Sequence, residues 1–167
     1  MTLLHIRPLD KLADVSAFSC GQLALDQYLA LYASQDVRRN VSRIFLASPT
    51  TSESTVAGYY SLSAASVQCA DLPASAAKKL PKYPVPVALL GRLAVATDFQ
   101  KRGIGSVLLM DACKKVVHAE SVLAVTGLVV DAKDDAAAAF YKHFGFMPLE
   151  NMQRRFFLGL QTFRQLV

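Results

Sequence analysis

Apolar runs alternate with turns and amphipathic stretches through the second half of the chain, and this alternation limits the fold more than any other feature. Residues 87–95 are apolar apart from Gly91 and Arg92, a pattern typical of a buried strand. The alternation predicts strand, helix, strand, helix and strand in the order 87–95, 103–119, 122–130, 134–144 and 156–160. Two acidic residues open the second helix and suit the positive end of its dipole. This order predicts an α/β protein with a mixed central β-sheet flanked by helices.

The first half of the chain adds further strands and amphipathic helices to this scheme. Its predicted elements are, in order, a strand at 3–7, one or two helices within 18–40, and strands at 43–47 and 56–64 joined by a turn at 48–53. The segment 71–86 contains four prolines, which predicts a short helix followed by an extended connector.

The length and composition favour one globular domain. A chain of 167 residues can bury its own core, so we expect a single domain over residues 1–167. Hydrophobic residues make up 53% and charged residues 19% of the sequence, which excludes a disordered chain. No apolar run approaches the roughly 20 residues that cross a membrane, and residues 1–8 do not resemble a signal peptide. We therefore expect a cytoplasmic protein.

The cysteines and histidines show no spacing typical of a metal site or of disulfides. The three cysteines are odd in number, widely separated and without a CxxC pair: Cys20, Cys69 and Cys113. We expect them to be small buried residues in a reducing compartment, and we expect no metal. The formal charge is +5, which is compatible with a polyanionic partner and equally with an ordinary basic protein.

Two glycines stand where the strand at 87–95 gives way to the next helix, in the hexapeptide Gln100-Lys101-Arg102-Gly103-Ile104-Gly105. The N–H groups of a first helical turn point outward and attract anions. Glycine removes the Cβ atoms that would keep a phosphate from those groups. Lys101 and Arg102 add positive charge beside them. The turn is therefore predicted to bind a phosphate or pyrophosphate.

Two common phosphate motifs fit this turn poorly. A P-loop requires a lysine directly after its last glycine, and none follows Gly105. A dinucleotide-binding fingerprint requires a third small residue where Leu108 stands. A capping turn without a ligand is the remaining alternative for the hexapeptide taken alone.

The hexapeptide matches a third pattern, Q/R-x-x-G-x-G/A, and resembles the pyrophosphate loop of the GNAT acetyltransferases. The segment 140–146, FYKHFGF, is similar to a second element of that superfamily, F/L-Y-x-x-x-G-F. Three further segments resemble one branch, the acetyltransferase toxins of toxin–antitoxin pairs, which acetylate aminoacyl-tRNA; they are 18–29, 58–64 and 83–95.

The resemblance implies a GNAT fold, acetyl-CoA as co-substrate and a set of cofactor-binding residues. It implies that the strand edge at Leu93-Ala94-Val95 pairs with the pantetheine arm and that the turn Gln100-Lys101-Arg102-Gly103-Ile104-Gly105-Ser106 holds the pyrophosphate. Asp134 stands where many members have asparagine. Tyr141 is implied as the general acid, since a phenol with a pKa of about 10 is protonated at neutral pH. No general base is evident.

The toxin branch further implies a tRNA substrate, a homodimer and a ribbon-helix-helix antitoxin. The residues expected to contact tRNA are basic: Arg92, Arg38, Arg39, Lys79 and Lys82. Of these, Arg92 interrupts an apolar strand, and a buried arginine requires an anionic partner, which the acceptor end of tRNA would provide. Two alternatives remain: an ordinary GNAT enzyme that acetylates a small-molecule or protein amine, and a non-catalytic acyl-CoA or nucleic-acid binding module.

Overall fold

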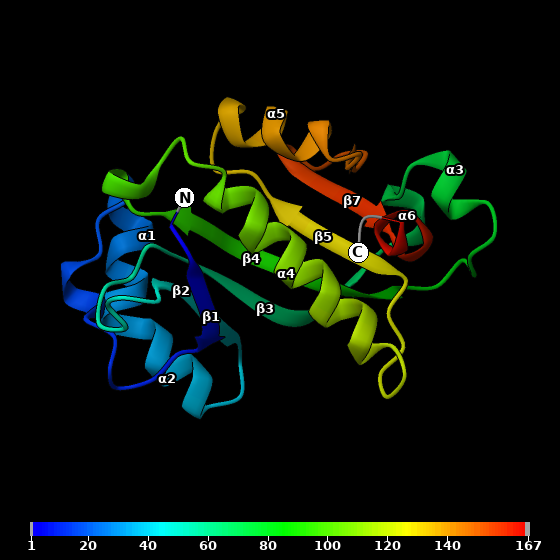
Figure 1. Cartoon of the computed structure of the whole chain (residues 1–167). Coiled ribbons are helices and arrows are strands. Elements are labelled where there is room, and N and C mark those ends of the chain that lie inside the picture. The colour runs from blue at the N-terminus through cyan, green and yellow to red at the C-terminus, as the bar shows by residue number, and fades with distance from the viewer. Residues whose placement is uncertain (1, 166–167) are drawn as a thin grey trace. The chain divides into compact units, whose positions relative to one another are not determined.

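The computed structural model describes residues 2–165 and has a mixed α/β architecture (Figure 1). Its strands are β1 (Leu4–Pro8), β2 (Arg43–Pro49), β3 (Gly58–Val67), β4 (Val85–Val95), β5 (Gly127–Asp131), β6 (Met147–Pro148) and β7 (Arg155–Gly159). Its helices are α1 (Leu23–Gln27), α2 (Ala33–Arg38), α3 (Ala74–Ala77), α4 (Ile104–Ala119), α5 (Asp135–His143) and α6 (Leu160–Arg164). A π-helical segment, Tyr28–Tyr32, joins α1 to α2.

The strands form one sheet in the order β1-β2-β3-β4-β5-β7-β6. β1, β2 and β3 are antiparallel neighbours, so the predicted hairpin of β2 and β3 is confirmed. β4 and β5 are parallel, with a register that runs from Ala88–Leu128 to Leu90–Val130. β7 is antiparallel to both β5 and β6. The sheet is therefore mixed, as the alternation of strands and helices predicted.

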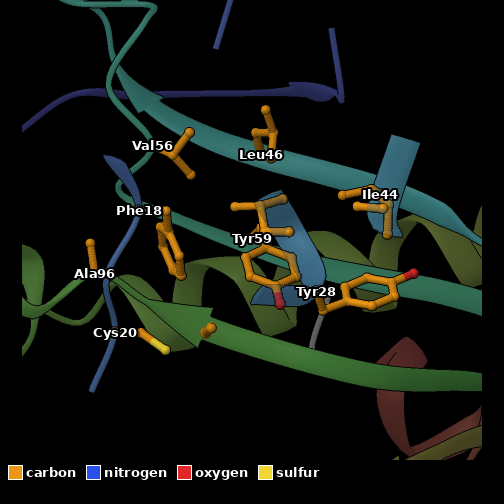
Figure 2. Packing of buried hydrophobic residues seen from close by; sticks show 11 residues of the cluster. Phe18, Cys20, Tyr28, Ile44, Leu46, Val56, Tyr59 and Ala96 are labelled. Atoms are coloured by element: carbon orange, nitrogen blue, oxygen red, sulfur yellow. The ribbon is translucent and has the colours of Figure 1, made fainter. Parts of the chain in front are cut away.

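The chain divides into two compact units, of which the first contains residues up to Ser63 together with Arg92–Asp111. Its hydrophobic core gathers side chains from the N-terminal helical region, β2, β3 and the end of β4 (Figure 2). The Phe18 ring meets the Tyr59 ring edge-on at 5.4 Å between centroids. The buried Tyr59 hydroxyl donates to the Leu25 carbonyl at 2.7 Å, so the helical region is fixed to the sheet by one polar contact within an apolar cluster.

The second unit contains Ala64–Gly91 together with the chain from Ala112 onward. Its core combines apolar residues of β3, β4, β5 and β7 with Leu72 and Leu149 from the connecting segments. The predicted short helix is confirmed by α3, but the extended connector is wrong: residues 78–84 form turns and bends, and β4 already begins at Val85. β5 and β7 lie side by side in this unit (Figure 1), which buries Val129 and Phe157.

The boundary of one predicted strand is wrong. Residues 122–130 were expected to be extended, but β5 begins only at Gly127. The N–H groups of Val122 and Leu123 both donate to the Ala119 carbonyl, so these residues form the turn that ends α4. The Val122 side chain is 87% exposed. The strand was predicted too long because Val122 and Leu123 are apolar, although they lie in a turn and face solvent.

Smaller differences concern the end of one predicted strand and some short elements that the sequence pattern did not reveal. β2 continues through Pro49, so the hairpin turn begins two residues later than predicted. The short elements β6 and α6 and the π-helical segment were not predicted.

All three cysteines are buried thiols, as expected, and burial raises the pKa of Cys113 to about 11. Within residues 2–165, no helix is long and apolar enough to span a membrane.

Candidate functional site

The glycine turn leaves β4, passes through a 3-10 turn at Thr97–Phe99 and enters α4 at Ile104. Lys101 and Gly103 adopt left-handed backbone angles, with φ of 64° and 78°. The Val107 N–H donates to the Gly103 carbonyl at 3.2 Å, so the N–H groups at 104–106 have no acceptor one turn earlier in the helix. No heavy atom lies within 4 Å of a Cβ added at Gly103. Donors and open space therefore coincide, which suits an anion.

The turn is fixed to its own unit by the Gln100 side chain. The Gln100 Nε2 atom donates to the Val95 carbonyl at the end of β4 and to the Cys20 carbonyl, each at 2.9 Å. The Arg102 guanidinium lies 5.4 Å from the centroid of the Phe99 ring, while Lys101 is exposed. These contacts hold the backbone of the turn and leave cationic side chains at its surface.

The end of β4 continues past its parallel register with β5. The last pair of that register is Leu90 with Val130, whereas β4 extends to Val95. Leu93 and Val95 are half-buried and Ala94 is buried. The predicted cofactor-binding strand residues therefore directly precede the glycine turn in one continuous stretch of chain.

Arg92 has an aromatic partner within its own unit, while the anionic partner expected for it, the acceptor end of tRNA, stays a prediction. Its guanidinium carbon lies 3.4 Å from the centroid of the Tyr28 ring. Within residues 2–165 this guanidinium makes no hydrogen bond and no ion pair. The Tyr28 hydroxyl donates to the Asp36 carboxylate at 2.7 Å. The sequence did not reveal the contact of Arg92 with Tyr28, because helical periodicity within residues 18–40 does not tell a core ring from one that stacks on a cation.

Tyr141 lies in α5 within an aromatic cluster, as the sequence suggested. Its side chain is 4% exposed, and the rings of Phe140 and Phe146 meet it edge-on at 5.4 Å and 5.5 Å. Burial raises the pKa of the Tyr141 phenol, and the negative charge of Asp131 raises it further. The hydroxyl makes no hydrogen bond within residues 2–165, yet no side-chain oxygen there is both fully buried and unpartnered. The hydroxyl oxygen must therefore reach the surface.

Asp134 has a clear structural role at the start of α5. It is the N-cap residue, and its Oδ1 atom accepts a hydrogen bond from the Ala137 N–H at 2.8 Å. The carboxylate is thus partly committed to the helix, and its predicted contact with a cofactor stays a prediction.

The other predicted substrate-binding residues are surface cations in their own units. Arg38 ends α2 and Arg39 follows it, and both are exposed. Lys79 and Lys82 follow α3 and are exposed as well. These positions are compatible with phosphate contacts. Among residues 2–165 no cluster of side chains that could hold a metal ion is present.

Known proteins resemble this chain in sequence. The model of the acetyltransferase (GNAT) domain matches residues 52–148. A protein of Mycobacterium tuberculosis named tRNA-acetylating toxin is 41% identical over 133 residues, which is 80% of this chain and 78% of the relative.

Solved structures resemble the chain over nearly its whole length. AtaT complexed with acetyl-methionyl-tRNAfMet has a TM-score of 0.90 and 32% identity, with 98% of each chain covered. A tyrosine-to-phenylalanine mutant of the AtaT toxin, bound to acetyl-CoA and to the C-terminus of the antitoxin AtaR, has a TM-score of 0.82 and 28% identity. That match covers 98% of this chain and 97% of the other.

Proposed function

The chain belongs to the GNAT acetyltransferase family, and we propose that it transfers the acetyl group of acetyl-CoA to the α-amino group of aminoacyl-tRNA. Such a reaction would block translation and make the protein a toxin. The observation that carries the proposal is the likeness, over 98% of both chains, to a toxin solved with acetyl-methionyl-tRNAfMet. The 41% identity with a tRNA-acetylating toxin supports it.

The residues of the first unit fit acetyl-CoA, which supplies the acetyl group as an activated thioester. The N–H groups of the glycine turn hold the pyrophosphate, and the open space at Gly103 allows the phosphates to approach the backbone. The edge of Leu93–Val95 pairs with the pantetheine arm, as an added strand would. A backbone N–H near Val95 then polarises the acetyl carbonyl.

Tyr141 acts as the general acid that protonates the departing thiolate. Its raised pKa keeps the phenol protonated at neutral pH, and its hydroxyl reaches the surface while the ring is held by Phe140 and Phe146. Asp134 contributes to the cofactor site from the start of α5. The chain needs no dedicated general base, because an α-amino group with a pKa of about 7.7 to 8.0 is partly neutral without help.

The tRNA is bound through its phosphates. Arg92 contacts the acceptor end, and the exposed cations Arg38, Arg39, Lys79 and Lys82 contact the backbone of the nucleic acid. We further propose that the protein works in the cytoplasm as a homodimer, that residues 1–167 form one functional domain, and that a ribbon-helix-helix antitoxin neutralises it. The complex of AtaT with the C-terminus of AtaR supports an antitoxin as partner.

The decisive experiment measures transfer of a labelled acetyl group from acetyl-CoA to charged tRNA, deacylated tRNA and a panel of small amines. We expect label only on charged tRNA, because deacylated tRNA lacks the amine. Binding of tRNA should weaken steeply as salt rises. Label on a small amine without any on charged tRNA would identify an ordinary GNAT enzyme instead.

A further inference from the structure

Three side chains of the first unit form a chain of contacts from Asp36 through Tyr28 to Arg92. The Tyr28 hydroxyl donates to Asp36 at 2.7 Å, and the Tyr28 ring lies beneath the Arg92 guanidinium at 3.4 Å. Figure 2 shows Tyr28 beside Tyr59 in the apolar cluster, and the hydroxyl of Tyr28 points away from the cluster. The ring therefore has one face on a cation and its polar end held by an acid.

A guanidinium carbon so close to the ring centroid requires the guanidinium to lie nearly parallel to the ring. A tilted group would drive its nitrogens into the ring atoms. Stacking uses only the face of the planar cation, so the N–H donors at its edge remain available. Since Arg92 makes no hydrogen bond or ion pair within residues 2–165, those N–H groups can donate to an anion from outside the chain.

Tyr28 is itself well placed to hold such a group rigidly. It is buried, and it opens the π-helical segment that joins α1 to α2. Departures from regular α-helix of this kind are frequent at functional sites. Burial and the bond to Asp36 raise the pKa of Tyr28 to about 12, while the charge of Arg92 acts in the opposite direction. The phenol therefore stays neutral and keeps its hydrogen bond to Asp36 at physiological pH.

We propose that Tyr28 is a positioning residue that holds Arg92 flat and ready to bind a phosphate of the tRNA acceptor end, and that Asp36 fixes Tyr28 in place. This inference rests on the proposed function. A carboxylate partner would neutralise Arg92 and occupy its donors, whereas an aromatic partner orients the cation and keeps both its charge and its donors. The stack thus explains how an arginine can stand in an apolar strand without an acid beside it.

The test is a double-mutant cycle read out by binding of fluorescently labelled, unfractionated deacylated tRNA. The variants are Tyr28→Leu, Arg92→Ala and the combination of both. Loss of the stack should weaken tRNA binding by about 3- to 30-fold in Tyr28→Leu. If Tyr28 acts through Arg92, the combined variant should bind tRNA no more weakly than Arg92→Ala alone. A role in folding only would instead lower binding by the same factor in both backgrounds.

Two further variants separate stacking from general packing. Tyr28→Phe keeps the ring but loses the bond to Asp36 that holds it, so its tRNA affinity should lie between those of the wild type and Tyr28→Leu. Tyr59→Phe is the matched control, because it removes another buried hydroxyl bond from the same cluster. It should leave tRNA affinity within about twofold while lowering the melting temperature. Acetyl-CoA affinity should be unchanged in all of these variants.

The outcomes distinguish this inference from the proposed function. The role of Tyr28 would be overturned by additive effects in the cycle, or by wild-type tRNA affinity in folded Tyr28→Leu. The proposed function would survive either result, provided that the wild-type protein still labels charged tRNA. A wild-type protein that neither binds nor labels tRNA would overturn the proposed function, and the phosphate-binding role of Arg92 with it.

Discussion

The side-chain amide nitrogen of Gln100 lies 2.9 Å from the carbonyl oxygen of Val95. The same nitrogen donates to the carbonyl of Cys20, also at 2.9 Å. One amide thus ties the start of the glycine turn to the end of β4 and to the segment that precedes α1. The turn is therefore held in place by side-chain hydrogen bonds of Gln100 as well as by its own backbone.

Replacing Gln100 with alanine should weaken acetyl-CoA binding. The two hydrogen bonds each stabilise the ordered turn by about 1 kcal/mol, so their loss should raise the dissociation constant for acetyl-CoA by about 3- to 30-fold. Isothermal titration of acetyl-CoA into each variant measures this change. Gln153→Ala, at an exposed turn position, serves as control and should bind as the wild type does. Equal affinities in the two variants would show that the Gln100 amide does not order the site.

Replacing Gly105 with valine, or Gly103 with a bulky residue, should abolish acetyl-CoA binding while the fold survives. A side chain at either position would stand between the phosphates and the N–H groups of the turn. At Gly103 the positive φ of 78° adds strain of roughly 1–2 kcal/mol for any side chain. Gly21→Ala provides the matched control, because Gly21 also has a positive φ and no heavy atom within 4 Å of an added Cβ. It should lose stability and retain acetyl-CoA affinity.

Removing only the hydroxyl of Tyr141, as in Tyr141→Phe, should lower the turnover number by about 10²- to 10⁴-fold. The ring contacts with Phe140 and Phe146 remain, so the melting temperature and acetyl-CoA affinity should stay close to those of the wild type. Single-turnover acetylation of charged tRNA measures the rate of the chemical step. Wild-type turnover in this variant would show that water or another group protonates the thiolate.

The acetylation rate should rise with pH and then level off, without an alkaline decline below about pH 10. The rise reflects deprotonation of the substrate amine. Burial and the charge of Asp131 raise the pKa of Tyr141, so the acid form of the phenol persists to higher pH than in a free tyrosine. A profile of kcat/KM from pH 6 to 9.5 tests this. A falling limb within that range would point to a different acid.

Asp134 offers a test that separates helix capping from cofactor binding. Asp134→Ala removes the acceptor for the Ala137 N–H and should lower the free energy of unfolding by about 1 kcal/mol. Asp134→Asn keeps a capping oxygen and should retain the stability. Its neutral amide should also bind acetyl-CoA at least as tightly, because it removes a negative charge from the predicted cofactor site. Unchanged acetyl-CoA affinity in folded Asp134→Ala would exclude residue 134 from that site.

Several parts of the fold and site were predictable because they depend on local sequence. The periodicity of residues 103–119 predicted α4, and the two glycines marked the turn before it. Two acidic residues before an alanine-rich run predicted the start of α5. Helical periodicity, glycine turns and capping residues act over a few positions, so they are visible in the sequence without knowledge of the fold. The strand at 122–130 failed at its start because apolar residues also occupy exposed turns.

The sequence by itself determined the class of fold and located the glycine turn and the two motifs that contain Gly103 and Tyr141. Only the tertiary structure decided which groups surround them. Gln100 bonds to a carbonyl 80 positions earlier in the chain, and Arg92 stacks on a ring from the π-helical segment. Such contacts depend on how distant segments pack, and side-chain stacking leaves no periodic signal in the chain. Local patterns therefore located the glycine turn whose N–H groups are proposed to bind the pyrophosphate, whereas packing alone assigned Arg92 its aromatic partner.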